Sequence, residues 1–378
     1  MEPGDTNIYL GLMSGTSVDG VDAALVRFPA NSIELIATHS HPWPEPLQRA
    51  LQGLNTPGDN EIDRLGELDI LAADAFASAA QTVLAKAGIS PSAVAAIGSH
   101  GQTIRHRPDA KNPFTLQIGD PNRIAEQTGI TTVADFRRRD MAAGGEGAPL
   151  APALHSTLFG SHDNYRCILN IGGIANITLL PPGRAAVAGF DTGPGNCLLD
   201  SWASRHNHAP FDKDGAWAAT GRVHPALLKR MLADDYFSRP PPKSTGREYF
   251  NLVWLERLTG QHPGLSPVEI QATLVALTAQ SIRNAIKGAA PECRQLLVCG
   301  GGVHNPTLMA QLRHDLPECR VESTRHYGAD PDWVEAIAFA WLARQTLLGL
   351  AGNLPSVTGA RHPVILGGIY QGSRGATG

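Results

Sequence analysis

The stretch that decides the fold is residues 8–28, IYLGLMSGTSVDGVDAALVRF. An apolar run over 8–13 is broken by SGTS at 14–17 and by DG at 19–20, after which apolar residues alternate with others. Alternation with a period of two is typical of a strand, and two such runs around a glycine-bearing break predict a β-hairpin. A glycine-rich turn lets backbone N–H groups approach an anion, because no Cβ stands in the way.

Two later segments repeat this arrangement. The apolar run 167–171 is interrupted by Gly172-Gly173 and resumes over 174–180, which predicts a second hairpin. A third run, 296–299, leads into three consecutive glycines and then a helical pattern. Any one of these turns is weak evidence for a ligand, because most hairpin turns are only turns. Together, and with a helix N-terminus nearby, they indicate a phosphate site.

Helical patterns alternate with these strands. Apolar residues recur every three or four positions from about Glu61 to Lys86, and this spacing predicts a long amphipathic helix. Further helices are predicted over 198–205, 267–286, 306–314 and 332–348. The alternation predicts an α/β architecture, and the repeated hairpin predicts two related halves. The first half is expected to cover 1–140 and the second 141–354, with 355–378 assigned to the first half as one of two options.

Composition excludes several functional classes. The chain has 378 residues and a net charge of −4, which gives no basic surface for nucleic acid. Its five cysteines form no CxxC pair and its 14 histidines show no HExxH spacing, so neither a disulfide scaffold nor a zinc hydrolase is favoured. The polar N-terminus and the lack of a long apolar run predict a cytoplasmic protein without a membrane span.

Seven stretches carry a resemblance to a known family. They are LGLMSGTSVDGVDAALV (10–26), IGSHGQTIRH (97–106), VADFRRRDMAAGGEGAPL (133–150), LNIGGIANIT (169–178), GFDTGPGN (189–196), PKSTGREYFN (242–251) and VCGGGVHN (298–305). The order of the three glycine elements resembles the phosphate-one, phosphate-two and adenosine signatures of the actin, Hsp70 and hexokinase superfamily. Within that superfamily, the chain resembles the anhydro-N-acetylmuramic acid kinases from about Tyr9 to Tyr370. P-loop and protein-kinase motifs are missing, which disfavours those classes.

The resemblance implies two RNase H-like domains flanking an ATP-binding cleft, and a homodimer. It implies ATP-dependent conversion of 1,6-anhydro-N-acetylmuramic acid and water to N-acetylmuramic acid 6-phosphate, a step of peptidoglycan recycling. It also implies nucleotide contacts from three loops: Ser14, Gly15, Thr16, Ser17, Val18, Asp19, Gly20 and Val21; Gly172, Gly173 and Asn176; and Gly300, Gly301 and Gly302. Asp19 is expected to hold Mg²⁺ through water, since magnesium keeps several waters and takes few carboxylates. An ordinary Asp-Gly turn is the alternative for Asp19.

Opening a ring at an anomeric carbon requires a carboxylate that activates water. The departing O6 can receive the γ-phosphoryl group, so a second carboxyl to protonate it is not needed. The resemblance assigns the single catalytic base to Asp191. The alternative is that Asp191 caps the helix predicted near 198 or stabilises a turn.

Four residues are expected to contact the sugar. In the run 137–139, at most one arginine is expected to do so, because such runs are usually solvated or ion-paired. The family pattern selects Arg139, whose guanidinium fork matches the lactyl carboxylate. His100, Gln102 and Glu335 are candidates for the sugar as well, with an exposed helix glutamate as the alternative for Glu335. Lys243 receives no role.

Two other functions stay open at this point. One is a different sugar or acyl phosphotransferase of the same superfamily, because substrate choice depends on a few residues. The other is a non-catalytic, nucleotide-switched binding protein, which would hydrolyse ATP slowly and independently of any substrate. The second reading gives no reason for an aspartate at position 191.

Overall fold

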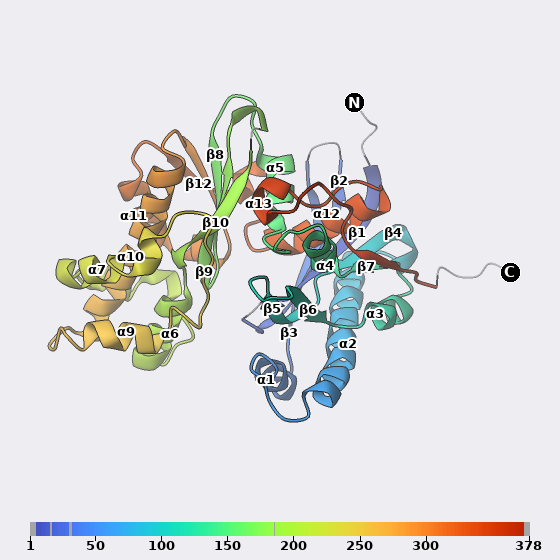
Figure 1. Cartoon of the computed structure of the whole chain (residues 1–378), viewed down its shortest axis with the longest axis horizontal. Helices are drawn as coiled ribbons and strands as arrows, with labels where there is room; N and C mark the ends of the chain where they lie inside the picture. The colour runs from blue at the N-terminus through green and yellow to red at the C-terminus, as the bar shows by residue number, and fades with distance from the viewer. Residues whose placement is uncertain (1–4, 16, 30–31, 185, 374–378) are drawn as a thin grey trace. The chain divides into compact units, whose positions relative to one another are not determined.

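The computed structural model describes the chain apart from residues 1–4, 16, 30–31, 185 and 374–378 (Figure 1). The chain forms two compact units, and the second is inserted in the sequence of the first. Unit 1 comprises Met1–Leu158 and Trp333–Gly378, and unit 2 comprises Phe159–Asp332. Each unit is built around one main sheet.

Unit 1 contains a six-stranded sheet in the order β13-β7-β4-β1-β2-β3. The strands are β1 (Asp5–Met13), β2 (Gly20–Phe28), β3 (Glu34–Pro42), β4 (Val94–Ser99), β7 (Thr132–Ala134) and β13 (Gly368–Tyr370). β1 and β2 form the predicted antiparallel hairpin, whereas β4 runs parallel to β1 and β7 parallel to β4. A separate hairpin joins β5 (Gln102–Arg107) to β6 (Phe114–Ile118).

Unit 2 contains a five-stranded sheet in the order β10-β9-β8-β11-β12. The strands are β8 (Arg166–Ile171), β9 (Ile174–Leu180), β10 (Ala188–Pro194), β11 (Gln295–Cys299) and β12 (Arg320–Ser323). Counted from the first strand of each unit, both sheets follow the order 3-2-1-4-5, with the second strand antiparallel to both neighbours. The prediction of an α/β fold with two related, RNase H-like halves is therefore confirmed.

Two long helices cover the two faces of the sheet in unit 1. α2 (Glu61–Ala87) packs with Leu10 and Leu12, whereas α12 (Val334–Leu347) packs with Tyr9, whose side chain points to the opposite face. The remaining helices of this unit are α1 (Glu45–Gly53), α3 (Pro121–Thr128), α4 (Phe136–Ala142), α5 (Ala151–Phe159) and α13 (Pro355–Thr358). By length and hydropathy, α2 is the one helix in the described residues that could cross a membrane, and 56% of its 18-residue apolar stretch is buried within the protein.

The position of α12 explains why the unit limits differ from the sequence-based boundaries, which placed 141–158 and 333–354 with the second half. α12 lies so close to the first sheet that a Cβ on Gly11 would meet the Ala336 carbonyl oxygen, and one on Gly98 would meet that of Phe339. Only glycine permits this approach. β13 pairs with β7, so the C-terminal segment also belongs to unit 1.

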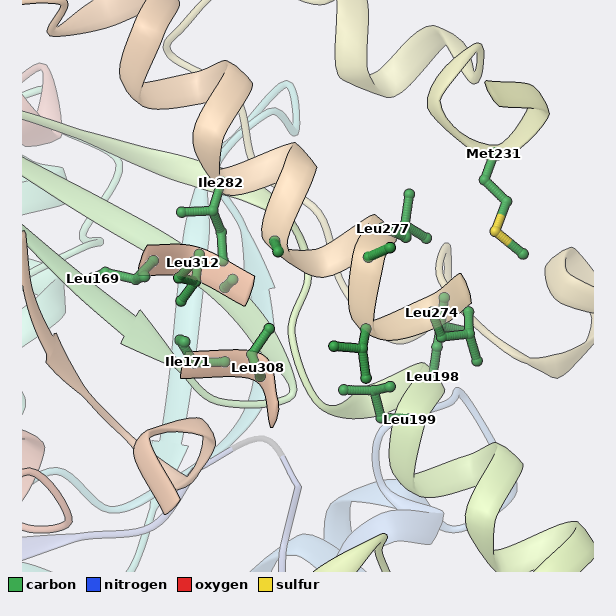
Figure 2. Packing of buried hydrophobic residues seen from close by; sticks show 14 of the residues in the cluster. Leu169, Ile171, Leu198, Leu199, Met231, Leu274, Leu277, Ile282, Leu308 and Leu312 are labelled. Atoms are coloured by element: carbon green, nitrogen blue, oxygen red, sulfur yellow. The ribbon is translucent and has the colours of Figure 1, made fainter. Parts of the chain in front are cut away.

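The core of unit 2 lies between its sheet and α10 (Pro267–Ala289), as Figure 2 shows for Leu169 and Ile171 of β8 and Ile282 of α10. Leu308 and Leu312 of α11 (Pro306–Asp315) complete this part of the cluster. The other helices of the unit are α6 (Cys197–Asn207), α7 (Pro225–Leu232), α8 (Asp235–Ser238) and α9 (Leu252–Thr259). These helices cover one face of the sheet, and the glycine loops follow the ends of β8 and β11.

Candidate functional site

The loop between β1 and β2 is held rigidly by its own side chains and by its neighbours. Ser14 is buried, and its Oγ lies 2.7 Å from both the Gly20 carbonyl oxygen and Gln102 Oε1. The N–H of Val18 donates to the Gly15 carbonyl over 3.2 Å. Val18 has a φ of +54°, which is unusual for a β-branched residue and costs about 1–3 kcal/mol. Such backbone strain is typical of ligand-binding loops. Thr16, also predicted to contact the nucleotide, lies outside the described residues.

Asp19 occupies the exposed end of the same loop. Ser17 Oγ donates to Asp19 Oδ1 over 2.9 Å, and Gly20 and Val21 then begin β2. Among the described residues, no group of three or more His, Cys, Asp or Glu side chains is arranged to hold a metal ion. An exposed carboxylate outside any such group fits a magnesium ion that keeps most of its water.

His100 and Gln102 lie directly beneath this loop. Gln102 is fully buried and donates from Nε2 to the Gly15 carbonyl over 3.2 Å. His100 Nδ1 lies 3.0 Å from the Ser14 carbonyl oxygen, and its Nε2 accepts from Arg137. Both polar side chains are therefore engaged within the protein, which gives them a positioning role for the loop. Their predicted contact with the sugar stays a prediction.

Arg137 makes contacts in unit 1 that sequence reasoning did not predict. Besides contacting His100, it donates from Nη1 to the Gly147 carbonyl over 2.9 Å. Burial lowers the pKa of Arg137 to about 10, while Glu335 acts in the opposite direction. Desolvation and the nearby Asp22 raise the pKa of Glu335, and Arg137 opposes this rise. The structure thus brings Arg137 and Glu335 into one electrostatic group with Asp19 and Asp22.

The other charged residues of α4 have different surroundings. Arg138 forms an ion pair of 3.4 Å with Asp135, as expected for a charged run. Arg139 is exposed, and in the described part of the chain its side chain has no hydrogen bond or ion pair. Asp140 is fully buried and accepts hydrogen bonds from the Gly147 N–H, Asn353 and Thr358, so it ties α4 to α13.

In unit 2, the β8–β9 loop is attached to the start of α6. The carbonyl of Gly172 accepts from the Asn196 N–H over 2.8 Å, and that of Gly173 accepts from the Gly195 N–H over 2.9 Å. Arg247 lies over the same loop, because a Cβ on Gly173 would stand 2.9 Å from its Nε. A glycine loop, a helix N-terminus and a guanidinium together favour an anion. Arg247 was missed because it is distant in sequence from the glycines.

Asp191 lies within β10, opposite Asn176 of β9. Its Oδ2 accepts a hydrogen bond of 2.9 Å from the Thr245 N–H, so the carboxylate caps no helix and the N-cap alternative does not hold. Burial raises the pKa of Asp191 to about 6, opposed by the Thr245 hydrogen bond and assisted by Glu248. Thr245 Oγ1 is buried without a hydrogen-bond partner among the described residues, which leaves it free for a ligand.

The third glycine element follows β11. Gly300 has a φ of +77°, and its N–H donates to the Pro331 carbonyl over 2.9 Å. A Cβ on Gly300 or Gly302 would collide with the end of β8, whereas one on Gly301 would find no atom closer than 3.8 Å. Beside this turn is a cavity of about 590 Å³, lined among others by Val303, His304, Met309, Arg313, Val321 and Glu322. This volume is typical of small-molecule sites.

The family model and the curated relatives that match this chain carry the same description. The family model described as anhydro-N-acetylmuramic acid kinase matches residues 7–372. Curated proteins called anhydro-N-acetylmuramic acid kinase include one from Xanthomonas axonopodis pv. citri, which is 54% identical and matches over 98% of this chain and 100% of its own length. Another, from Coxiella burnetii, is 53% identical over 97% of this chain and 98% of its own. A solved structure, component A of (R)-2-hydroxyglutaryl-CoA dehydratase from Acidaminococcus fermentans, is similar with a TM-score of 0.48 and 12% identity, covering 89% of this chain and 96% of that one.

Proposed function

The chain belongs to the anhydro-N-acetylmuramic acid kinase family, and on that premise we propose that it converts 1,6-anhydro-N-acetylmuramic acid, water and ATP into N-acetylmuramic acid 6-phosphate and ADP. It is a phosphotransferase of cell-wall recycling. Relatives that are 53–55% identical over nearly the full length do not favour another sugar or acyl phosphotransferase.

In the proposed reaction, Asp191 takes a proton from water while the water oxygen bonds to the anomeric carbon. The bond between that carbon and O6 breaks, and O6 attacks the γ-phosphorus in line. The bond between the γ-phosphorus and the bridging oxygen breaks, and ADP leaves. One carboxylate is sufficient, because the phosphoryl group rather than a proton is transferred to O6.

The observation that carries this proposal is the environment of Asp191. The Thr245 N–H holds the carboxylate in one orientation over 2.9 Å. Burial raises its pKa to about 6, close to neutral, where a general base combines availability with proton affinity. The unpartnered Thr245 hydroxyl offers a further polar contact for substrate or water.

Nucleotide contacts are proposed for the three glycine loops. The loop at 14–21 of unit 1 would contact the phosphates, and so would the Gly172-Gly173 turn of unit 2, with Arg247 as an additional cation beside that turn. The cavity lined by Val303 and His304, which follow the third glycine loop, would receive the adenosine. Asp19 would hold magnesium through water; when bound, the ion neutralises charge on the phosphates. Asn176 stays a proposed neighbour of the phosphate loop.

Sugar contacts are proposed for unit 1 residues. Arg139 has a free, exposed guanidinium suited to the lactyl carboxylate. Glu335 of α12, whose carboxylate interacts electrostatically with Arg137, would accept hydrogen bonds from sugar hydroxyls. His100 and Gln102 would contact the sugar as well, while they hold the loop after β1 through the Ser14 and Gly15 carbonyls. A homodimer in the cytoplasm completes the proposal, by analogy with the family.

The direct test incubates the chain with ATP, Mg²⁺ and 1,6-anhydro-N-acetylmuramic acid and measures product mass. The expected product carries one water and one phosphoryl group more than the substrate, with one ADP formed per product. ADP formation without a phosphorylated sugar would contradict the proposal. Glucose and N-acetylglucosamine serve as control acceptors and should remain unmodified.

A further inference from the structure

Unit 2 contains a cavity that the proposed reaction does not use. It has a volume of about 430 Å³ and lies between β10, α8 and the C-terminal half of α10. Phe190 and Phe237 provide aromatic walls, and Ala285, Gly288 and Ala289 of α10 leave the space open because their side chains are small. Such a volume with mostly apolar walls is characteristic of small-molecule sites.

The cavity lies behind the strand that carries the proposed base. Successive side chains of a strand point to opposite faces of its sheet. Asp191 is paired with Asn176, whereas Phe190 is paired with Ile177 of the buried core that faces α10. Phe190 lines the cavity and Asp191 does not. The cavity is therefore separate from the space in front of the Asp191 carboxylate.

Two cationic side chains line the cavity. Arg239 and Lys243 both line it, and in the described part of the chain neither forms an ion pair with a carboxylate. Lys243 Nζ donates instead to the Tyr236 carbonyl over 3.2 Å and lies 4.7 Å from the centroid of the Tyr236 ring. Burial and the like charge of Arg239 lower the pKa of Lys243. An anion placed between the two would relieve this repulsion.

We propose that this cavity is a second binding site, which takes a small molecule with an apolar ring or chain and one anionic group such as a carboxylate, sulfonate or phosphate. The aromatic walls and α10 bind the apolar part, and Arg239 and Lys243 bind the anion. The Asn284 amide remains for additional hydrogen bonds, and Ser281 Oγ, which donates to the Thr278 carbonyl over 3.0 Å, can still accept one.

The site is connected to Asp191 through the backbone. The Asp191 N–H donates to the Lys243 carbonyl over 3.0 Å, and the Tyr236 hydroxyl donates to the Asp191 carbonyl over 2.7 Å. Lys243 and Tyr236 are themselves joined by the ammonium contact. A ligand that draws the Lys243 ammonium away from Tyr236 therefore acts on both residues that hold the Asp191 backbone.

The test uses two fluorescent probes, 8-anilinonaphthalene-1-sulfonate and the uncharged N-phenyl-1-naphthylamine, which share the same rings. The sulfonate should bind one per chain, and a non-hydrolysable ATP analogue with Mg²⁺ should not displace it. Arg239→Gln should weaken the sulfonate roughly 3- to 10-fold and leave the uncharged probe unchanged, because only the ionic contact is lost. Ala285→Trp, which fills the cavity, should abolish binding of both probes.

The exposed Arg230 of α7 gives the matched control, and Arg230→Gln should change neither affinity. Circular dichroism melting checks that each variant is folded. If Ala285→Trp does not fold, Arg239→Gln still tests the proposal, because Arg239 is exposed and its replacement should not affect folding. Absence of binding, displacement by the nucleotide analogue, or equal affinity of the wild type and Arg239→Gln for the sulfonate would overturn the proposal. None of these outcomes depends on the proposed kinase reaction.

Discussion

Arg137 donates two hydrogen bonds to Nε2 of His100, from Nε over 3.1 Å and from Nη2 over 2.9 Å. Because Nε2 accepts, the proton of the imidazole is on Nδ1, which donates to the Ser14 carbonyl over 3.0 Å. Burial and the adjacent Arg137 lower the pKa of His100 to about 3, so the ring stays neutral near pH 7. A neutral histidine thereby joins the loop after β1 to α4.

The first prediction concerns this contact. Arg137→Ala should lower the free energy of unfolding by about 2–4 kcal/mol, because His100 and the Gly147 carbonyl both lose their donor. Arg138→Ala, the adjacent control, should cost less than about 1 kcal/mol, since its ion pair with Asp135 is exposed. Urea denaturation measures both. Equal costs for the two variants would show that the Arg137 contacts contribute nothing to stability.

The second prediction concerns Arg139. Arg139→Ala should raise KM for the anhydro sugar roughly 10- to 150-fold through loss of a charge-assisted contact, and leave KM for ATP nearly unchanged. Steady-state kinetics with each substrate varied in turn measures this, with Arg138→Ala as the control. Wild-type enzyme that used the anhydro derivative of N-acetylglucosamine, which lacks the lactyl group, equally well would contradict the assignment.

Much of the fold could be predicted because its signals are local. The glycine interruptions marked both hairpins, and the period of α2 was visible within its own 27 residues. The unit to which α12 belongs was not predictable in this way. It depends on Gly11 and Gly98, which leave room for the helix backbone more than 200 residues later in sequence.

The candidate site also contains residues with a local sequence signal and residues whose contacts depend on the fold. The strand-end glycines could be proposed as candidates because each turn lies within one short motif, and the family resemblance supplied Asp191. Arg137 and Arg139 are equivalent in sequence, since each belongs to a run of three arginines, and only the fold shows that Arg137 contacts His100. The sequence likewise does not distinguish Thr245 from other threonines, whereas the structure shows that its N–H donates a hydrogen bond to Asp191.

The third prediction separates the ligand-facing glycine of the third loop from a packing glycine. Gly301→Ala should fold normally, because the new Cβ has no neighbour closer than 3.8 Å, but should raise KM for ATP, because this turn contacts the nucleotide in the proposed function. Gly300→Ala should destabilise the protein, since its φ is +77° and its Cβ would stand 2.3 Å from Asn170 Oδ1. Thermal melting and ATP kinetics together distinguish the two. An unchanged KM for ATP in Gly301→Ala would argue against nucleotide contact at this turn.

The fourth prediction follows from the pKa of Asp191, which burial raises from 3.8 to about 6. The folded state binds the proton more tightly than the unfolded state, so this group favours folding at low pH, and that contribution is lost as pH rises through about 6. Asp191→Asn should therefore be more stable than the wild type at pH 8, with the difference disappearing below about pH 4. Urea midpoints measured across this range test it. A variant less stable than the wild type at pH 8 would mean that the Asp191 charge stabilises the fold.

The fifth prediction assigns the catalytic proton transfer. In the wild type, kcat/KM for the sugar should fall as pH drops below about 6, because a protonated Asp191 cannot accept a proton from water. Asp191→Asn keeps the shape and an oxygen that can accept from Thr245, yet should lose about 10²- to 10⁴-fold in kcat with ATP affinity near that of the wild type. In H₂¹⁸O, the wild-type product should carry the label at the anomeric oxygen, measured before exchange with solvent removes it. Label in the phosphate would mean that water attacks phosphorus as in a simple ATPase, and a fully active Asp191→Asn enzyme would require a different base.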